Sequence, residues 1–379
     1  MAPTPSELYI GLMSGTSLDG VDAAAVEFDD RHPLGLSLLA HCHVPYPEDT
    51  RALARVLNSS GPDELHHSQL LSNKVSRLYA AAVAQLLREL DLPVSSIRAL
   101  GAHGQTVRHR PGEFDGNGYT VQLINGALLA ELSGIDVVCD FRSRDVAAGG
   151  QGAPLVPAFH AAIWRSDVQD IAIANIGGMA NVTLLGQQGE LIGFDTGPGN
   201  VLLDAWCQLH QKGPYDAGGA WGATGQPLPA LLEALLSEPF FHQPPPKSTG
   251  RDLFELAWLQ ASLARTQHQR AAPERVQATL VELTASTLAQ AITQYQPDGQ
   301  LIAVCGGGAF NDHLLDRIRA HAPNRHIATT HSLGLDPQHV EAIAFAWLAR
   351  AFEHRQPGNH PAVTGAKGFR ILGAKHPAT

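Results

Sequence analysis

The chain has 379 residues, of which 44% are hydrophobic and 16% are charged, an ordinary composition for a globular protein. A chain this long exceeds the size at which one hydrophobic core usually stops growing, so we expect two domains. The formal charge of −10 disfavours a nucleic-acid partner, because such binding relies on Lys and Arg. No apolar run approaches the roughly 18 residues of a membrane span, so we expect no membrane association.

The compartment is suggested by the start of the chain and by its cysteines. The first residues lack the basic segment and the apolar run of a secretory signal. Four cysteines lie far apart in apolar surroundings: Cys42, Cys139, Cys207 and Cys305. Buried reduced thiols, and hence the cytoplasm, are expected. Strand alternation would place His41 and His43 on one face with Cys42 opposite, so we expect no histidine-ligated metal there.

The first half of the chain alternates strands with helices. Apolar runs between turn residues predict strands at residues 8–13, 21–28 and 36–44, joined by short turns into an antiparallel meander. Apolar side chains at helical spacing predict helices at residues 50–57 and 64–90. Further strands are predicted at residues 97–102, 119–124 and 136–141, with a helix between the last two.

The second half begins in the same way, with strands at residues 171–176 and 181–185 around a glycine turn. Helices are then predicted at residues 201–210, 228–236, 254–264, 277–294 and 337–352. A strand at residues 301–305 meets a triple glycine, and the tail after Gly358 is predicted to be irregular. Each half thus opens on a glycine-rich hairpin, which predicts two α/β lobes with a ligand cleft between them.

The strongest chemical signal is the turn in residues 11–22, GLMSGTSLDGVD. Its small residues expose several backbone N–H groups, and glycine permits the close approach that a phosphate cradle needs. Asp19 and Asp22 fit a hydrated Mg²⁺, which takes few carboxylates and keeps several waters. A plain hairpin turn with solvated carboxylates is the alternative, because turns of this composition are common.

Two more glycine turns suit a nucleotide. The NIGGMAN hairpin at residues 175–181 would clamp terminal phosphates with Gly177 and Gly178. At residues 304–311, VCGGGAFN, the bare Gly306 and Gly307 would let a base or ribose approach the backbone. This turn is not a dinucleotide fingerprint, because Asn311 stands where that pattern requires glycine. The alternatives are an ordinary hairpin and a tight strand-to-helix turn.

A candidate base lies in residues 193–200, GFDTGPGN, ahead of a predicted helix. Asp195 follows an apolar strand end, so we expect it in a partly desolvated cleft, where a carboxylate can activate water or a hydroxyl. Gly197 and Gly199 would leave room for a ligand, and the helix N-terminus favours an anion. The alternative is that Asp195 only caps the turn. P-loop and protein-kinase motifs are absent, so a nucleotide enzyme would need paired hairpins instead.

Taken together, these motifs resemble the anhydro-N-acetylmuramic acid kinases over nearly the whole chain. The resemblance rests on the order of SGTSLDGVD (14–22), GQT (104–106), DFRSRD (140–145), GGQGAP (149–154), NIGG (175–178), FDTGPGN (194–200), KSTGR (247–251) and CGGGAFN (305–311). It implies the two-lobed α/β fold of the actin-like ATPases (ribonuclease H-like), in the actin, sugar-kinase and heat-shock ATPase superfamily. It also implies ATP-dependent conversion of 1,6-anhydro-N-acetylmuramic acid to N-acetylmuramic acid 6-phosphate, with opening of the anhydro ring, in peptidoglycan recycling.

The resemblance assigns roles to individual residues. The implied ATP-binding positions are Gly15, Thr16, Ser17, Leu18, Asp19, Gly20, Val21, Asp22, Gly177, Gly178, Gly306, Gly307 and Asn311. Asp195 would deprotonate the water that attacks C1, and Asp19 would hold Mg²⁺ through water. The implied sugar contacts are Glu341, Arg142, Arg144, Gly197 and Asn200, with the arginines suited to a lactyl carboxylate. A solvated helix carboxylate is the alternative for Glu341, and an inter-lobe salt bridge is the alternative for the arginines.

We place the N-terminal lobe at residues 1–140, with the tail 356–379 returning to it, and the C-terminal lobe at 141–355. The resemblance implies a homodimer in the bacterial cytoplasm whose partners are ATP, the anhydro-sugar and water. Two other classes compete with the kinase. An ATPase switch would leave Asp195 and Glu341 without a role, and a plain glycoside hydrolase using those two carboxylates would not explain the phosphate-type hairpins.

Overall fold

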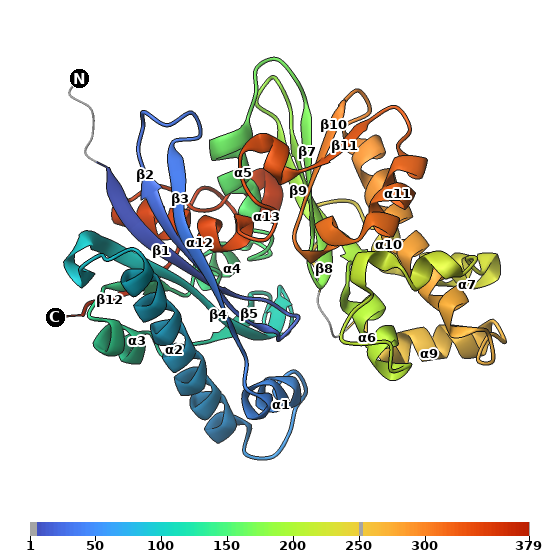
Figure 1. Ribbon diagram of the computed structural model, residues 1–379, viewed down its shortest axis with the longest axis horizontal. Helices are drawn as coiled ribbons and strands as arrows, with labels where there is room; N and C mark the ends of the chain where they lie inside the picture. Colours follow the sequence, from blue (N-terminus) through green and yellow to red (C-terminus); the bar gives the residue numbers. More distant parts are fainter. Residues whose placement is uncertain (1–5, 250–252, 379) are drawn as a thin grey trace. The chain divides into compact units, whose positions relative to one another are not determined.

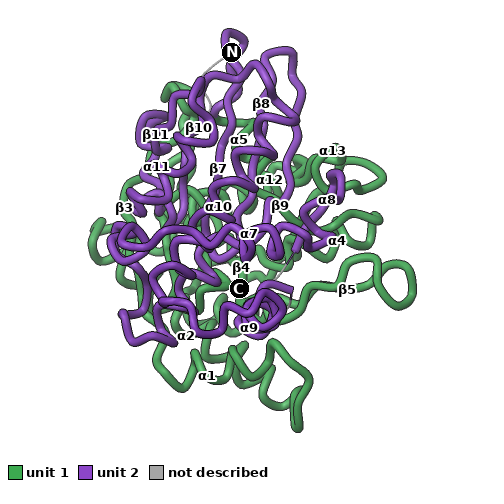
Figure 2. The backbone as a smooth tube through the Cα atoms, turned by 90° about the vertical axis from the view of Figure 1, so that its right-hand side faces the viewer, with its two compact units in different colours: residues 1–163, 339–379 green, residues 164–338 purple. Residues whose placement is uncertain are grey.

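The computed structural model describes residues 6–249 and 253–378, and the chain divides into two compact units (Figure 2). Unit 1 comprises residues 1–163 and 339–379, and unit 2 comprises residues 164–338. Each unit contains one sheet with helices, so the predicted α/β class is confirmed. The end of the KSTGR motif, residues 250–251, lies outside the described residues.

Unit 1 is built on a seven-stranded sheet in the order β12-β6-β4-β1-β2-β3, with β5 paired to β4 (Figure 1). Its strands are β1 (Glu7–Ser14), β2 (Gly20–Phe28), β3 (Leu36–Pro45), β4 (Ile97–Pro111), β5 (Gly118–Leu123), β6 (Val137–Cys139) and β12 (Ala374–His376). The antiparallel pairs β1–β2 and β2–β3 confirm the predicted meander. Parallel pairing joins β4 to β1 and to β6, which brings the loops after β1 and β4 to the same edge.

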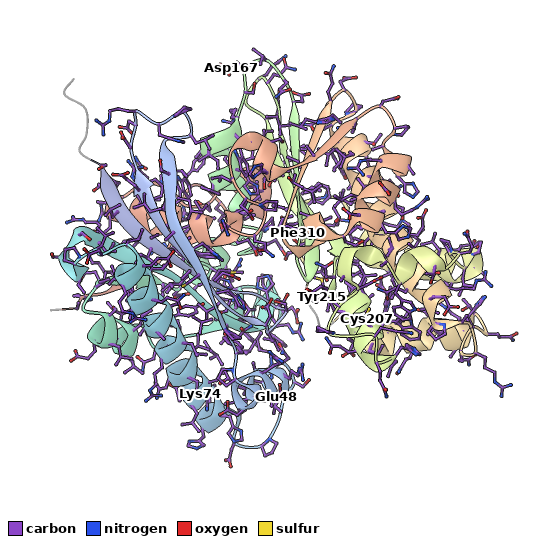
Figure 3. The ribbon with its side chains drawn as sticks, viewed as in Figure 1. Glu48, Lys74, Asp167, Cys207, Tyr215 and Phe310 are labelled. Carbon is purple, nitrogen blue, oxygen red and sulfur yellow. The ribbon has the colours of Figure 1, made fainter. Side chains whose placement is uncertain are left out.

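The helices of unit 1 are α1 (Glu48–Val56), α2 (Glu64–Glu89), α3 (Gly126–Ser133), α4 (Ser143–Ala147), α5 (Val156–Trp164), α12 (Val340–Glu353), α13 (Pro361–Thr364) and the short η1 (Val94–Ser96). Buried side chains recur along α2 at helical spacing and pack into the core beside β2 and β3, among them Leu71, Val75 and Leu86. An ion pair between Lys74 and Asp49 joins α2 to α1, the helices that carry the labelled Lys74 and Glu48 in Figure 3.

Helix α12 belongs to unit 1 because its backbone lies directly on the sheet. A Cβ atom added to Gly11 of β1 would stand 1.8 Å from the carbonyl oxygen of Ala342, and one added to Gly101 of β4 would stand 1.9 Å from that of Phe345. Only glycine permits this approach. Residues 339–355, which we predicted to lie in the C-terminal lobe, are therefore in unit 1.

The tail also joins unit 1, through a strand that we did not predict. β12 pairs antiparallel with β6, and the Ala374 to His376 segment extends the sheet. Residues 141–163, also predicted for the C-terminal lobe, belong here as well. They are bonded to the tail: the Gln151 N–H donates to the Thr364 carbonyl, and the Lys367 N–H donates to the Ala148 carbonyl.

Unit 2 is built on a five-stranded sheet in the order β11-β10-β7-β8-β9. Its strands are β7 (Ile171–Ile176), β8 (Met179–Leu185), β9 (Leu191–Pro198), β10 (Leu301–Cys305) and β11 (His326–Thr329). Its helices are α6 (Val201–Leu209), α7 (Pro229–Leu236), α8 (Pro239–His242), α9 (Leu256–Arg265), α10 (Pro273–Tyr295) and α11 (Asp312–His321). Its described residues also form the short helices η2 (Ala217–Gly219), η3 (Gly222–Thr224), η4 (Gly307–Phe310) and η5 (Thr330–Leu333).

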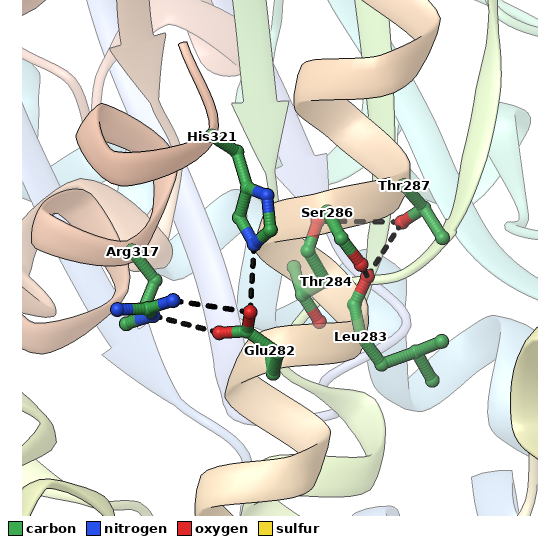
Figure 4. A network of polar contacts seen from close by, with 7 residues as sticks. All are labelled: Glu282, Leu283, Thr284, Ser286, Thr287, Arg317 and His321. Atoms are coloured by element: carbon green, nitrogen blue, oxygen red, sulfur yellow. Dashed lines mark hydrogen bonds and ion pairs between the residues drawn. The ribbon is translucent and has the colours of Figure 1, made fainter. Parts of the chain in front are cut away.

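A carboxylate joins two of these helices. Glu282 of α10 accepts hydrogen bonds from Arg317 Nε at 2.7 Å and from His321 Nε2 at 2.7 Å, both on α11 (Figure 4). Burial alone would raise the pKa of Glu282, but the hydrogen bonds from Arg317 and His321 outweigh it and lower the pKa below its usual value. This contact fixes α11, which carries the glycine turn of β10 at its N-terminus.

Among the described residues, none of the helices combines the length and the apolar character that a bilayer span requires.

Candidate functional site

The first glycine turn links β1 to β2 in unit 1 and covers residues 15–19. Leu18 adopts a positive φ of 59° and buries its side chain, which turns the chain between the antiparallel strands. The loop is tied down from three sides, by Gln105 Nε2 donating to the Gly15 carbonyl, Arg51 Nε to the Leu18 carbonyl and the Tyr46 N–H to the Asp19 carbonyl. A fixed loop presents its remaining backbone groups without further loss of conformational entropy.

A buried network supports the end of β1. Ser14 Oγ donates to the Gly104 carbonyl at 2.9 Å and lies 2.8 Å from the Tyr79 hydroxyl, which also accepts the Gly104 N–H. The Tyr46 hydroxyl donates to Gln105 Oε1 at 3.0 Å, so the amide that holds Gly15 is itself oriented. We did not predict roles for these supporting side chains, although residues 104–106 form one of the motifs on which the family resemblance rests.

The two aspartates of the 11–22 motif, Asp19 in the turn and Asp22 in β2, have different surroundings. Asp19 is exposed, and its Oδ1 accepts Ser17 Oγ and the Gly20 N–H. Asp22 Oδ1 instead lies 3.1 Å from His43 Nδ1 and 3.2 Å from His41 Nε2. Burial would raise the pKa of Asp22, but hydrogen bonds from both histidines lower it to about 2. An exposed carboxylate suits a hydrated cation, so Asp19 fits Mg²⁺ better than Asp22 does.

The histidine arrangement matches the strand alternation that we predicted. His41 and His43 both reach Asp22 on one face of β3, whereas Cys42 is buried in the core on the other. His339, just before α12, stacks on His41 with ring centroids 4.0 Å apart. This contact brings the N-terminus of α12, with the half-buried Glu341 in its first turn, beside the β1–β2 hairpin.

Arg142 and Arg144 lie at the start of α4 in unit 1. Arg142 is half-buried and donates from Nη1 to the Gly152 carbonyl at 2.8 Å, while Nε and Nη2 reach His103 Nε2 at 3.2 and 2.9 Å. Arg144, by contrast, has an exposed side chain. Of the two arginines, Arg142 therefore has the more constrained guanidinium.

The same segment contains a fully buried carboxylate whose role we did not predict. Asp145 Oδ1 accepts Asn359 Nδ2 at 2.7 Å and Thr364 Oγ1 at 2.8 Å, and Oδ2 accepts the Gly152 N–H at 2.8 Å. Asp145 thus fastens the glycine loop 149–152, whose Gly152 carbonyl holds Arg142, to the tail of the chain.

In unit 2 the second hairpin joins β7 to β8 through Gly177 and Gly178. The turn is bonded to the start of α6, because the Asn200 N–H donates to the Gly177 carbonyl at 2.8 Å and the Gly199 N–H donates to the Gly178 carbonyl at 2.9 Å. Asn200 Nδ2 also donates to the Ile176 carbonyl at 3.1 Å. Asn200, predicted as a sugar contact, therefore also holds the hairpin.

The third turn, after β10, lies against the second. A Cβ added to Gly306 would stand 2.6 Å from Asn175 Oδ1, and one added to Gly307 would stand 3.4 Å from Asn200 Nδ2. Asn311 is buried and caps α11, since its Oδ1 accepts the Leu314 N–H at 2.9 Å. Phe310, labelled in Figure 3, is 50% exposed at the end of η4. Unit 2 thus brings Gly177, Gly306 and Asn200 together.

Asp195 lies within β9, not after its end as we predicted, because β9 continues to Pro198 by pairing with β8 across a register shift. Its side chain is 6% exposed. The Asp195 N–H donates to the Lys247 carbonyl at 3.1 Å, and Oδ2 accepts the Thr249 N–H at 2.8 Å. The segment at 247–249 thereby fixes the orientation of the carboxylate.

Lys247 anchors that segment. It is 8% exposed, donates from Nζ to the Phe240 carbonyl at 3.0 Å, and lies over the Phe240 ring at 4.7 Å. Burial lowers the pKa of Lys247, while the nearby Asp195 charge acts in the opposite direction. Gly197, with φ of 139°, could not carry a Cβ, which would stand 2.5 Å from the Phe241 ring. Gly197 therefore allows the Phe241 ring to pack closely against β9 near Asp195.

Comparison with known proteins identifies the family. A sequence model described as anhydro-N-acetylmuramic acid kinase matches residues 7–378. The chain is 55% identical over 377 residues to the anhydro-N-acetylmuramic acid kinase of Variovorax paradoxus, covering 98% of this chain and 99% of that protein. It is 49% identical over 379 residues to the protein of that name from Cupriavidus metallidurans, with 99% of each covered.

A solved structure with a similar backbone is the activator of the 2-hydroxyisocaproyl-CoA dehydratase from Clostridium difficile with bound ADPNP. The likeness has a TM-score of 0.48 at 13% identity and covers 92% of this chain and 97% of that one.

The α/β chain, with its glycine hairpins and its buried carboxylate, is a sugar kinase by these sequence matches. It belongs to the anhydro-N-acetylmuramic acid kinase family.

Proposed function

We propose that this chain uses ATP and water to convert 1,6-anhydro-N-acetylmuramic acid into N-acetylmuramic acid 6-phosphate. The observation that carries the proposal is the family match over residues 7–378. The product retains the cell-wall sugar skeleton, which places the reaction in peptidoglycan recycling. The names and bacterial sources of the relatives suit a bacterial cytoplasmic enzyme, and we propose a homodimer.

The chemistry combines attack at an anomeric carbon with phosphoryl transfer. Water adds to C1 and gives one proton to the base, the C1–O6 bond breaks, and O6 attacks the γ-phosphorus of ATP as ADP leaves. The oxygen of water becomes the C1 hydroxyl, and the bridging oxygen becomes the phosphate ester. Transfer to O6 stabilises the leaving oxygen, so a second carboxylic acid of the glycosidase kind is not required.

Asp195 is our candidate base. Its burial and the hydrogen bond from the Thr249 N–H to Oδ2 support the role, because a base must be held within reach of the proton that it removes. In unit 1, Arg142 and Glu341 are the candidate sugar contacts, with Arg142 meeting the lactyl carboxylate through its guanidinium. Arg144, Gly197 and Asn200 remain further candidates for the sugar.

Phosphoryl transfer asks mainly for positioning and charge neutralisation. We assign the terminal phosphates to the loop from Gly15 to Asp22 and to Gly177 and Gly178, and the adenosine to the turn of Gly306 and Gly307. Asn311 supports that turn as the cap of α11. Asp19 would hold a hydrated Mg²⁺ through water, and this ion would neutralise phosphate charge when bound.

An ADP-release assay with isotope tracing tests the proposal. Purified protein with Mg-ATP should release ADP in the presence of the anhydro-sugar, and neither N-acetylmuramic acid nor buffer alone should support release. In H₂¹⁸O, promptly quenched product should carry the label at C1 and none in the phosphate ester. Release without sugar would favour the ATPase switch, and ring opening without ATP would favour the hydrolase.

A further inference from the structure

His103 is a buried side chain to which the proposed reaction gives no role. It lies in β4, is 4% exposed, and packs its ring against Phe345 of α12 with centroids 4.8 Å apart. Its Nδ1 lies 3.3 Å from the carbonyl oxygen of Ser14, the last residue of β1 before the ATP loop. Its Nε2 is reached by Arg142 Nε and Nη2 at 3.2 and 2.9 Å.

These contacts define the protonation of the ring. A guanidinium only donates hydrogen bonds, so His103 Nε2 must accept. A carbonyl oxygen only accepts, so Nδ1 must carry the proton and donate to Ser14. Burial and the Arg142 charge hold the pKa of His103 well below its usual range, which is consistent with a neutral ring. One tautomer therefore satisfies both neighbours at once.

The ring thereby connects two parts of the proposed site. On one side, His103 and the Gly152 carbonyl hold the guanidinium of Arg142 between two acceptors. On the other side, the ring bonds to the carbonyl of Ser14, whose side chain joins the Tyr79 network and which directly precedes the ATP loop. A displacement of Arg142 would therefore move the His103 ring and alter its hydrogen bond to the Ser14 carbonyl.

We infer that His103 is a positioning residue that couples the sugar-binding guanidinium of Arg142 to the ATP phosphate loop at Ser14, so that each substrate favours binding of the other. The inference rests on the proposed function. Coupling of this kind is reciprocal, so the anhydro-sugar should tighten ATP binding by the same factor as ATP tightens the sugar.

Two substitutions separate the two contacts. In His103→Asn the side-chain N–H takes the place of Nδ1, which keeps the bond to Ser14 and loses Arg142. In His103→Gln the side-chain oxygen takes the place of Nε2, which keeps Arg142 and loses the bond to Ser14. Loss of the coupling raises both KM values, and loss of a direct contact raises one of them further. We therefore expect His103→Asn to raise KM for the sugar about 10- to 100-fold and KM for ATP by less, and His103→Gln to raise mainly KM for ATP.

His160 offers a matched control for disturbing a buried imidazole. It is 1% exposed on α5 in the same unit, and burial lowers its pKa to about 3. His160→Asn and His160→Gln should lower the unfolding temperature as the His103 variants do, while leaving the ratio of the two KM values unchanged. Equal KM ratios in the His103 and His160 variants would reduce His103 to a packing role and overturn the inference.

A double-mutant cycle and a binding measurement complete the test. Arg142→Ala should raise KM for the sugar, and adding His103→Asn should then raise it no further. Calorimetric titration with a non-hydrolysable ATP analogue should show sugar-enhanced affinity in the wild type that is lost in both His103 variants. Additive effects, or enhancement that persists, would overturn the coupling. A wild type inactive on the anhydro-sugar would instead overturn the proposed function, and the inference with it.

Discussion

The buried Asp145 carboxylate provides the sharpest structural prediction, tested by Asp145→Asn. The substitution preserves size but replaces one acceptor oxygen with an NH₂ group. Whichever way the amide turns, one end faces a donor: Gly152 N–H on the Oδ2 side, or Asn359 Nδ2 and Thr364 Oγ1 on the Oδ1 side. The favoured orientation keeps the oxygen toward the tail and leaves the Gly152 N–H without an acceptor.

The magnitude follows from that geometry. One hydrogen bond to a charged acceptor is lost, worth about 1.5–3 kcal/mol, and a buried donor is left unsatisfied at a further cost of about 1–3 kcal/mol. Because these terms overlap, we expect Asp145→Asn to destabilise unit 1 by about 3 kcal/mol. For a unit of about 200 residues this corresponds to a fall in Tm of roughly 6–12 °C.

Differential scanning calorimetry measures this directly, with Glu131→Gln on α3 as the control. Glu131 is exposed, so removing its charge should change the Tm by less than about 1 °C. Sugar KM should also rise in Asp145→Asn, because the Gly152 carbonyl that holds Arg142 lies in the released loop. A Tm within about 1 °C of the wild type would refute the view that this carboxylate fastens the loop to the tail.

Three further predictions concern unit 2. Asp195→Asn should lower kcat about 10³-fold and leave the affinity for an ATP analogue unchanged, because only the base is lost and the amide oxygen can still accept the Thr249 N–H. A near-normal kcat in a coupled assay would exclude the base role. We expect the half-exposed Phe310 ring to cover the adenosine, so Phe310→Ala should raise KM for ATP several-fold and leave KM for the sugar unchanged. Equal changes in the two KM values would argue against that placement. Glu282→Gln should lower Tm at pH 7 by an amount worth about 1–2 kcal/mol. The pKa of Glu282 is lower in the folded state than its ordinary value. Its contribution to the free energy of unfolding is therefore present above the ordinary carboxyl pKa and is lost as pH falls through the folded pKa. The Tm values of the wild type and the variant should converge in acid, and a difference that stays constant with pH would contradict this linkage.

The local elements with strong patterns were predictable from the sequence. The strands at residues 171–176 and 301–305 agree with β7 and β10 to the residue, and the long α2 differs from prediction by one residue at its end. Each is bounded by glycines, prolines or polar turns that stop the apolar pattern. Asp195 was expected in partly desolvated surroundings as a candidate base, and the structure buries its side chain, while the base role stays a prediction.

Elements defined by tertiary pairing were not predictable in this way. β9 contains Gly193, Gly197 and Pro198, which weaken any strand pattern, and it extends past Asp195 only because β8 supplies its hydrogen bonds. β12 is a three-residue strand whose formation depends on β6. The boundary between the units differs from the predicted one for a similar reason. Gly11 and Gly101 allow α12 to pack closely on a sheet whose strands come hundreds of residues earlier in the chain.

The candidate site shows the same division between what is local and what is long-range. The turns that we assign to ligands are local motifs, whereas the groups that hold them come from distant segments: Tyr79 for β1, Asp145 for the glycine loop and Lys247 for β9. Supporting groups of this kind are buried and hydrogen-bonded, so their substitution should reduce stability and activity together. Asp195→Asn and Phe310→Ala differ, because the amide oxygen in place of Asp195 Oδ2 can still accept the Thr249 N–H and the contacts that are lost are the proposed ones with substrate. These substitutions should therefore change kinetics with little change in Tm, and this separation is the measurable distinction between a group that performs the chemistry and one that positions it.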